Sequence, residues 1–413
     1  MLPLPQSTTL SVAQVQQHIN TAITAVSGSE QITLSDGLNR ILDSDIVADI
    51  DVPPFDNSAM DGYAFCAQDL ELHHVLTIVG QAYAGHPFPG QLQSGQAVRI
   101  TTGAPLPDYA DSVLPQEQAV VTDSSTLAMQ GISVQAGQHK RRRGEDIAAG
   151  TEAINQGTRL GPVELGLLAS IGVTTISVKR KVQVAIFSTG DELITAGEQL
   201  SAATVYDSNR VTLRALLIQC GAEVLDLGVL EDNPATIEAA LRDAANRTDL
   251  IITSGGVAGG AADFTKQVMR QLGQINFWSV NMRPGRPLAF GAIDKNNQHE
   301  KTYLFGLPGN PVAMMISFHL FVRPALQLLS GSQINEPLQI KAITNGAIYK
   351  KSGRTEFQRG IVKIDVDGTL RVTVFSEQGS AMLSSMMRAN CLVVLSEEQE
   401  NIAAGDTVKI ILN

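Results

Sequence analysis

The chain has 413 residues, with 30 basic and 41 acidic side chains and a formal net charge of −11. A chain of this length predicts several domains rather than one core. The acidic balance argues against general binding to nucleic acid or to a membrane surface, although it allows a local basic pocket.

The cysteines and the N-terminal segment indicate where the protein works. Cys66, Cys220 and Cys391 are far apart in the chain and match no metal or disulfide spacing, so we expect buried thiols in a reducing compartment. Residues 1–20 lack a basic start followed by an apolar core, and no apolar run reaches the ~20 residues that span a membrane. These features predict a soluble, cytoplasmic protein.

The N-terminal part reads as helical, followed by a loop. Ser11 can cap a helix whose apolar residues share one face, and a short helix is expected at 35–42. Residues 51–64 contain two prolines, a glycine and small polar residues, which predicts a loop rather than a regular element. From the residues alone, a domain linker is the slightly favoured interpretation of this stretch.

Residues 75–146 have the short, Gly- and Pro-broken apolar runs of a β-rich segment, with strands expected at 75–79, 96–101 and 112–114. The segment ends in the basic run 140–143, followed by Glu145 and Asp146. A solvated face and an anion contact both remain open for this run. A helix from Pro162 to about Gly172 then returns the chain, which makes the first domain discontinuous.

The chain is organised around an α/β block at 181–330. Strands are expected at 182–187, 223–227, 249–253, 275–280 and 302–305. Between them lie helices with caps at Asp207 or Ser208 and at Asn233, a helix at 264–272, and a long apolar helix that begins at Asn310 and kinks at Pro324. The alternation predicts a mainly parallel sheet covered on both faces.

Three of these strands end in Gly-rich or acidic loops ahead of helices, which predicts a site for a phosphorylated ligand at their carboxyl ends. Glu192, Asp232 and Asp263 follow strands of the block, and carboxylates in such places suit Mg²⁺. Each acid alone is better explained as a cap, but three at one sheet edge favour a functional site. The loop 255–260 could approach an anion closely, and it fits neither a Walker A loop nor a dinucleotide fingerprint.

Two arginine positions could bind anions. Arg283 and Arg286 flank a tight turn, where their guanidiniums could bind a phosphate through paired hydrogen bonds. A surface turn without a ligand is an equally good interpretation. Arg359 and Ser380 lie in a period-two segment from Leu338 onward that predicts a small β domain; taken alone, they are better explained as structural residues. The histidines show no ligand spacing, and no Ser-His-Asp or Cys-His set stands out.

Six motifs, in order and along nearly the whole chain, resemble the molybdopterin molybdenumtransferases, the MoeA and gephyrin E-domain family. They are PPFDNSAMDGYA at 53–64, RRGED at 142–146, STGDEL at 188–193, YDSN at 206–209, SGGV at 254–257 and GLPGNP at 306–311. The chain departs from the family's usual pattern at Ser279, Arg283 and Arg286, where relatives often carry lysine, and at Ala258 and Gly259 in the Gly-rich loop.

The resemblance implies four domains. These are a helical N-terminal domain (1–50 and 147–180), an inserted β-rich domain (51–146), a MoaB/MogA-like molybdopterin-binding α/β domain (181–330) and a C-terminal β barrel (331–413). It also implies a homodimer in which the partner's Asp61 region completes the active site, so the stretch at 51–64 gains a function that its composition did not indicate.

The resemblance implies a Mg²⁺-dependent reaction that takes adenylylated molybdopterin and molybdate, inserts molybdenum at the dithiolene and releases AMP. The implied catalytic residues are Asp61, Asp146, Glu192, Asp232, Asp263, Arg283 and Arg359; the metal ligands among them are Glu192, Asp232 and Asp263. The implied cofactor-binding residues are Thr189, Gly190, Ser254, Gly255, Gly256, Pro308, Gly309, Asn310 and Ser380.

The implied partners are a donor protein for adenylylated molybdopterin and molybdoenzyme or chaperone recipients, with no nucleic acid and no membrane. Three alternatives stay open: a non-catalytic molybdopterin-binding scaffold or carrier, the molybdopterin adenylyltransferase step itself, and tungstate as the inserted oxyanion.

Overall fold

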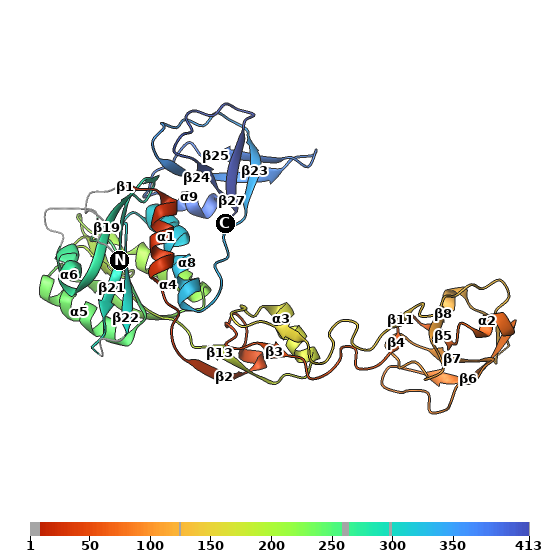
Figure 1. The fold of residues 1–413 in the computed structure, drawn as a ribbon. Helices are drawn as coiled ribbons and strands as arrows, with labels where there is room; N and C mark the ends of the chain where they lie inside the picture. Colours follow the sequence, from red (N-terminus) through yellow and green to blue (C-terminus); the bar gives the residue numbers. More distant parts are fainter. Residues whose placement is uncertain (1–8, 124, 258–263, 297–299, 413) are drawn as a thin grey trace. The chain divides into compact units, whose positions relative to one another are not determined.

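The computed structural model describes residues 9–123, 125–257, 264–296 and 300–412. The chain forms two compact units (Figure 1). The larger unit comprises 1–30, 39–41 and 178–413, and the smaller unit comprises 31–38 and 42–177. The four predicted domain ranges are finer than these two units and stay predictions.

The larger unit contains a seven-stranded sheet in the order β1-β19-β21-β22-β18-β14-β17. The strands are β1 (Thr9–Leu10), β14 (Gln183–Thr189), β17 (Glu223–Leu230), β18 (Leu250–Ser254), β19 (Gly273–Val280), β21 (Pro287–Asp294) and β22 (Lys301–Leu307). The predicted parallel core is confirmed by the pairing of β14 with β17 and β18, and of β18 with β22. Strand β21 was not predicted, and it runs antiparallel to both β19 and β22.

Helices cover both faces of this sheet, as expected for an α/β block. They are α1 (Val12–Ala22), α4 (Ser208–Gln219), α5 (Pro234–Arg247), α6 (Phe264–Leu272), α7 (Pro311–Ser317) and α8 (Arg323–Leu329). One apolar core joins α1, α4, α7 and α8 to the sheet, and a second joins α5 and α6. The predicted caps are confirmed: Ser11 forms a capping box, Asp207 accepts from the Arg210 amide, and Asn233 accepts from two amides of α5.

The long apolar helix runs from Pro311 to Leu329 through a π-helical segment, η3 (Phe318–Val322), that lies directly before Pro324. A π-helical turn thus interrupts the helix shortly before Pro324, and the kink predicted at Pro324 itself stays a prediction. By length and composition this helix could cross a membrane, which no run in the sequence was expected to do, but most of it is buried inside the protein. Gln16 of α1 donates to the Leu320 carbonyl at 3.1 Å, so the helix is tied into the core of its unit.

His319 of η3 makes the larger unit sensitive to acid. Burial lowers the pKa of His319 to about 4, with a further contribution from Arg323. The folded protein thus keeps this imidazole neutral below the ordinary pKa near 6.5, whereas the unfolded chain protonates there. Stability is therefore expected to fall as the pH drops from 6.5 toward 4, by about 3 kcal/mol in all.

We therefore expect His319→Leu to flatten the loss of stability between pH 6.5 and 4. The unfolding midpoint of the larger unit can be followed through the fluorescence of Trp278, the single tryptophan, which is buried there. Replacement of the exposed His86 by Leu is the control, and it should leave the pH dependence of this midpoint unchanged. Equal acid sensitivity in the parent and in His319→Leu would contradict this assignment.

The smaller unit contains a six-stranded sheet in the order β8-β5-β7-β6-β10-β9. Its strands are β5 (Gly62–Phe65), β6 (Val75–Ala82), β7 (Gln96–Ile100), β8 (Ser112–Pro115), β9 (Val120–Asp123) and β10 (Thr126–Ala128). The β-rich prediction is confirmed, but the prediction of a loop throughout 51–64 is wrong. Strand β5 pairs with β7 and β8, and a Cβ at Gly62 would lie 2.0 Å from the Leu114 carbonyl oxygen. A residue that looked like a turn glycine is required by close strand packing.

The rest of the smaller unit consists of short elements. They are β2 (Ser29–Thr33) with β13 (Thr175–Lys179), β3 (Ile46–Val47) with β12 (Glu152–Ile154), β4 (Asn57–Ser58) with β11 (Lys140–Arg141), α2 (Asp69–Leu72), η2 (Gln116–Gln118) and α3 (Pro162–Ser170). The predicted helix at 162–172 is confirmed. The helix predicted at 35–42 is wrong: only a 3₁₀ turn, η1 (Leu34–Asp36), forms before Gly37, which packs against Leu165.

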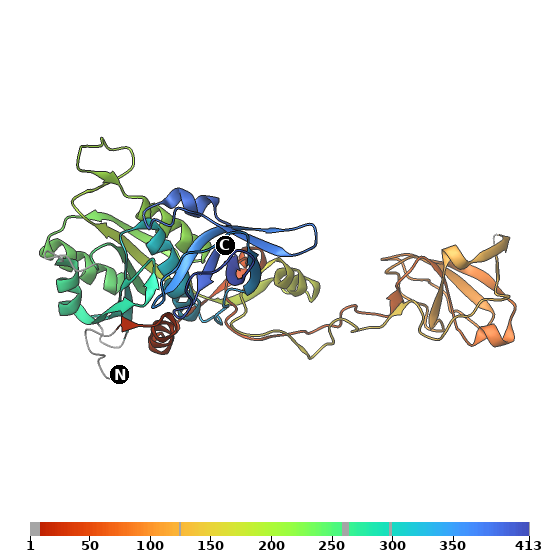
Figure 2. The same cartoon turned by 90° about the horizontal axis from the view of Figure 1, so that it is seen from above.

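The C-terminal strands of the larger unit close into a five-stranded barrel. They are β23 (Gln339–Thr344), β24 (Thr355–Ile364), β25 (Leu370–Val374), β26 (Cys391–Leu395) and β27 (Thr407–Leu412), with α9 (Leu383–Arg388) alongside. The pairing of β24 with both β25 and β26 completes the ring. Strand β20 (Met282–Arg283) pairs with β24, and both views place the barrel, in blue, beside the α/β part (Figures 1 and 2).

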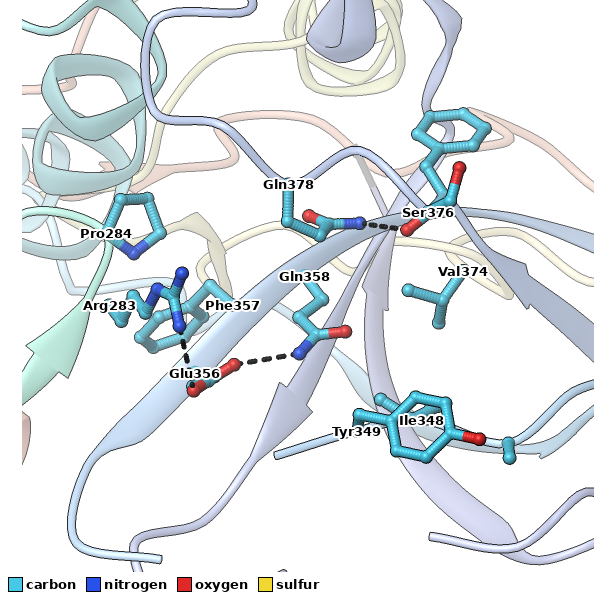
Figure 3. Close-up of a pocket in the computed structure, with 12 residues that line it drawn as sticks. Arg283, Pro284, Ile348, Tyr349, Glu356, Phe357, Gln358, Val374, Ser376 and Gln378 are labelled. Carbon is cyan, nitrogen blue, oxygen red and sulfur yellow. Dashed lines mark hydrogen bonds and ion pairs between the residues drawn. The ribbon is translucent and has the colours of Figure 1, made fainter. Parts of the chain in front are cut away.

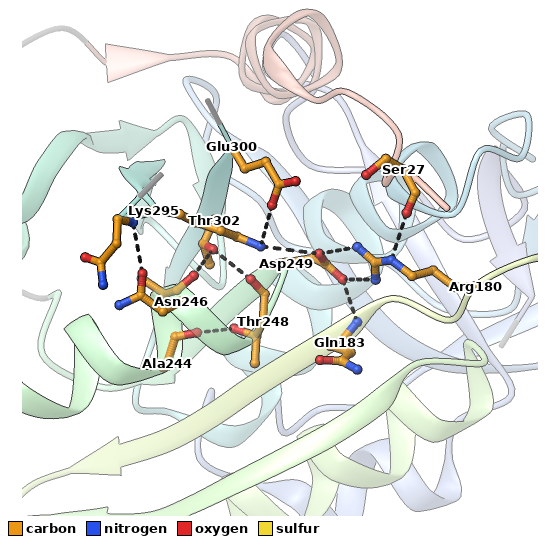
Figure 4. A network of polar contacts seen from close by, with 12 residues as sticks. Ser27, Arg180, Gln183, Ala244, Asn246, Thr248, Asp249, Lys295, Glu300 and Thr302 are labelled. Carbon is orange, nitrogen blue, oxygen red and sulfur yellow. Dashed lines mark hydrogen bonds and ion pairs between the residues drawn. The ribbon is translucent and has the colours of Figure 1, made fainter. Parts of the chain in front are cut away.

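An ion pair between a buried aspartate and a half-buried arginine anchors the amino ends of two neighbouring strands (Figure 4). Arg180 binds the Asp249 carboxylate through two hydrogen bonds of 2.7 and 2.8 Å, and the Gln183 amide donates to the same carboxylate at 2.9 Å. The Asp249 side chain is 8% exposed. Hydrogen bonding to Asp249 raises the pKa of Arg180. This contact ties the start of β14 to the residue that precedes β18.

Candidate functional site

The predicted ligand site begins where β14, β18 and β22 end. Ser188 of β14 is in register with Ser254 of β18. Asn209, in the first turn of α4, donates to the Ser254 hydroxyl and to the Gly309 carbonyl, both at 2.7 Å. One amide thereby connects α4, the SGGV loop and the GLPGNP loop. Asn209 lies in the YDSN motif but was not among the predicted site residues.

This edge of the sheet also holds polar atoms that lack hydrogen-bond partners. Within the described ranges, the Ser188 hydroxyl and the Asn209 side-chain oxygen are buried and unpaired. Buried polar groups are normally hydrogen-bonded, so unpaired ones are notable where a ligand is expected. The structure therefore leaves hydrogen-bonding capacity at the predicted ligand edge.

The described part of the Gly-rich loop uses glycine for backbone conformation and close packing. Gly255 and Gly256 have φ of +96° and +67°, and a Cβ at Gly256 would lie 2.7 Å from the Cβ of Thr265. The Gly255 amide donates to the Leu307 carbonyl at 3.0 Å. Thr265 of α6 donates to Thr189 at 3.4 Å, on the same side of the loop. The predicted residues Thr189, Ser254, Gly255, Gly256 and Gly309, with the neighbouring Pro308 and Asn310, thus surround one sheet edge.

The predicted acids differ in placement. Glu192 is exposed and turns back over Gly190, where a Cβ would come within 2.6 Å of its carboxylate. Asp232 is half-buried in the loop after β17 and has an interaction partner. Asp263 lies outside the described residues. Over the described ranges, no group of three or more metal-binding side chains comes together, so the metal site at Glu192, Asp232 and Asp263 remains a prediction.

An arginine at the start of α4 forms a charge cluster that the sequence did not indicate. Arg210 donates to both carboxylate oxygens of Asp226, at 3.0 and 2.9 Å, and to Asp207 at 3.2 Å. Burial opposes the charge of Arg210, but the hydrogen bonds to Asp226 and Asp207 outweigh it and raise the pKa of the guanidinium. Two carboxylates thus surround one guanidinium, which leaves no free positive charge for an anion and gives the cluster a role in holding α4 against β17.

Arg359 of β24 is the largest fully buried side chain of the described structure. One of its terminal nitrogens donates to the carbonyls of Gly379 and Glu377, at 3.0 and 3.3 Å. Its other two nitrogens have no partner within the described part of the chain, and burial lowers the pKa of the guanidinium. The Ser380 carbonyl accepts from the Val312 amide at 3.0 Å, so the loop that touches Arg359 also touches α7. A buried cation that lacks a matching acid is suited to bind an anion.

The turn at 283–286 packs against the same helix. Gly285 has φ of +97°, and a Cβ there would lie 2.8 Å from the Ser317 hydroxyl of α7, which is itself buried and unpaired among the described residues. Arg283 is exposed, with its guanidinium 3.9 Å from Glu356. Arg286 donates to the Ser279 hydroxyl at 2.7 Å, so this serine orients a neighbouring cation.

Asp61 and Asp146 both lie in the smaller unit. Asp61 accepts from the backbone amide and the hydroxyl of Thr102, at 2.7 and 2.9 Å, and these bonds lower its pKa. Asp146 is exposed. In the nearby basic run, Lys140 pairs with Asp56 and Arg143 with Asp51, both at 2.5 Å. Thr102 was missed because it comes next to Asp61 only when the sheet forms.

Thr102→Val should raise the pKa of Asp61 toward its ordinary value, because the variant loses the hydroxyl donor. Thr102→Ser keeps both donors and should leave the pKa unchanged. Carboxyl ¹³C NMR titration of Asp61 measures the difference. An unchanged titration in Thr102→Val would show that the hydroxyl bond does not hold the carboxylate ionised.

Family models cover most of the chain. Residues 10–172 match the MoeA N-terminal region (domain I and II), 185–328 match a probable molybdopterin binding domain, and 341–412 match the MoeA C-terminal region (domain IV). The chain is 41% identical over 383 residues to the molybdopterin molybdenumtransferase of Haemophilus influenzae, covering 92% of this chain and 93% of that protein.

More distant relatives agree with this assignment. The chain is 33% identical over 430 residues to Dictyostelium discoideum gephyrin, covering 93% of this chain and 59% of gephyrin. The crystal structure of a molybdopterin biosynthesis moeA protein from Pyrococcus horikoshii matches with a TM-score of 0.83 at 28% identity, over 98% of this chain and all of that chain. The chain therefore belongs to the molybdopterin molybdenumtransferase (MoeA) family, and it is a transferase of molybdenum cofactor biosynthesis.

Proposed function

We propose that this protein inserts molybdenum from molybdate into the dithiolene of adenylylated molybdopterin, with release of AMP and dependence on Mg²⁺. The observation that carries the proposal is the fully buried, incompletely paired guanidinium of Arg359 in the unit that also holds the Gly-rich strand ends. One unit thus offers a place for a tetrahedral oxyanion and a place for a phosphate.

The two places have different chemistry. Arg359 supplies hydrogen-bond donors and positive charge for molybdate, together with Arg283 in the turn that packs against α7. Ser254, Gly255, Gly256 and Gly309 bring backbone close to the phosphate of the adenylyl group. The buried cation would bind the oxyanion away from water, and the lower dielectric there strengthens the attraction between the two charges.

Oxygen-bearing side chains at the sheet edge support the proposed Mg²⁺ dependence. The Asn209 oxygen and the Ser188 hydroxyl of this edge are buried without partners among the described residues. Mg²⁺ prefers a few oxygen ligands together with substrate phosphates. Glu192, Asp232 and Asp263 would hold the ion, which when bound would neutralise charge on the pyrophosphate. Asp263→Ala should then abolish Mg²⁺-dependent AMP release, and unchanged release would remove the metal role of this residue.

We also propose a homodimer in which Asp61 and Asp146 of one protomer complete the site of its partner. The support is that the Asp61 carboxylate is exposed and is held in position by two hydrogen bonds from Thr102, so it is available to meet a cationic site. Mixing Asp61→Asn with Arg359→Met protomers should restore part of the activity that each variant lacks. A monomer by light scattering, or no recovery on mixing, would remove the shared site.

The cellular setting follows from the reaction. A cytoplasmic enzyme would receive adenylylated molybdopterin from a donor protein and pass the product to a molybdoenzyme or a chaperone, with no nucleic acid or membrane involved.

The test is AMP release from adenylylated molybdopterin with Mg²⁺, in the presence and absence of molybdate. Molybdate-dependent release is expected. Tight binding without release would identify a scaffold or carrier, and AMP-ester formation from unmodified molybdopterin and ATP would identify an adenylyltransferase. Either outcome would overturn the proposal. Tungstate in place of molybdate measures the oxyanion preference.

A further inference from the structure

A cavity of about 450 Å³ lies where the turn at 283–284 meets the barrel (Figure 3). Pockets of about 300–1,000 Å³ accommodate small molecules and cofactors. Its walls come from β24, from the end of β25 and the loop after it, and from the segment around Tyr349. The lining residues used in the argument below are Arg283, Tyr349, Glu356, Gln358 and Phe375.

Glu356 is the unusual member of this wall. It is only 8% exposed, and among the described residues its carboxylate accepts one side-chain hydrogen bond, of 2.8 Å, from Gln358. Arg283 lies 3.9 Å from the other oxygen, which is too far for a hydrogen bond. Figure 3 shows the carboxylate between these two side chains, at the cavity wall. A carboxylate accepts about four hydrogen bonds, so most of its capacity is available to a ligand.

We propose that this cavity binds the pterin ring of the substrate through its 2-amino-4-oxo edge, with Glu356 as the acceptor; this rests on the proposed function. That edge presents two parallel N–H donors, from N3 and from the 2-amino group, separated like the two donors of an arginine fork. A carboxylate pairs with such an edge through two hydrogen bonds. The Gln358 bond fixes the plane of the carboxylate before the ligand arrives.

The other walls suit the rest of the ring. Phe375 lines the cavity and holds the Arg388 guanidinium at 5.1 Å from its centre, which restrains the aromatic ring. Tyr349 is 82% exposed at the rim, an apolar surface that a bound ring would cover.

The test compares two fluorescent ligands that differ at one atom position, 6-carboxypterin and 6-carboxylumazine. Lumazine carries a carbonyl in place of the 2-amino group, so a hydrogen-bond acceptor would face the Glu356 carboxylate where pterin presents a donor. Fluorescence anisotropy titration of the full chain should show at least about tenfold preference for the pterin. Equal affinity for both ligands, or no binding, would overturn the proposal without any variant being needed.

Two variants locate the effect. Glu356→Gln should bring the pterin-to-lumazine ratio close to one, while Glu400→Gln, an exposed acid of the barrel, should keep the parent ratio. A retained preference in Glu356→Gln would also overturn the assignment. Trp278 fluorescence confirms that each variant is folded.

The proposed function is scored separately by AMP release. If the parent releases AMP but shows no pterin preference, the cavity assignment fails and the insertion reaction stands. If the parent prefers pterin but releases no AMP, the cavity assignment stands and the proposed insertion reaction fails.

Discussion

Arg359→Met is expected to give a protein that is more stable than the parent and inactive in molybdenum insertion. The parent keeps a fully buried guanidinium with two unpaired nitrogens, and no acidic partner is recorded for it in the described chain. Replacing a buried charge with an apolar side chain of similar volume is often stabilising, by about 1–4 kcal/mol. The same change removes the donors proposed to hold the oxyanion, so molybdate-dependent AMP release should fall by at least about 100-fold.

The measurement is the unfolding midpoint by Trp278 fluorescence, with and without molybdate, alongside AMP release. Molybdate should raise the midpoint of the parent, because a ligand that binds only the folded state stabilises it. It should leave Arg359→Met unchanged. The control is Arg371→Met in the same barrel, where the side chain is 37% exposed and pairs with Asp365. A destabilised Arg359→Met variant, or one that still responds to molybdate, would show that the arginine is structural.

Asp249→Ala is expected to cost the larger unit about 1.5–3 kcal/mol, because it removes the carboxylate that accepts two hydrogen bonds from the Arg180 guanidinium, which is 35% exposed. It also removes the acceptor of the Gln183 amide at the start of β14. The matched control is Asp243→Ala, which breaks an exposed pair with Arg247 and should change stability by less than about 0.5 kcal/mol.

Chemical denaturation followed through Trp278 fluorescence reports on the larger unit, which also contains Asp249. If Asp249→Ala unfolds at the same midpoint as Asp243→Ala, the ion pair does not anchor the central strands. An Arg180→Ala variant that matches Asp249→Ala, together with a double variant that is no worse than either, would confirm that the two residues act as one pair.

Local patterns predicted the α/β block well. Ser11 and Asn233 cap helices because their side chains serve the amides directly after them, which is information within one turn of sequence. Two of the strands that were missed, β5 and β21, depend on distant partners. Gly62 reads as a turn residue until β8 lies against it, and Pro287 obscures a strand that β19 and β22 hold from both sides.

The site was predicted less completely, for the same reason. Family motifs pointed to the strand-end loops, yet Asn209 and Thr102 gain their contacts only when separate elements pack together. Arg359 alone looked structural from its sequence context. Its burial with two unpaired nitrogens is a property of the folded barrel and could not be read from the pattern of β24.

The most direct measurement of the proposed reaction is the amount of molybdenum bound to the dithiolene product against the amount of AMP released, in one reaction with Mg²⁺ and molybdate. Equal amounts, both lost in Arg359→Met, are the predicted result. AMP release that proceeds without molybdenum in the product, or at the same rate without molybdate, would contradict insertion as the function of this protein.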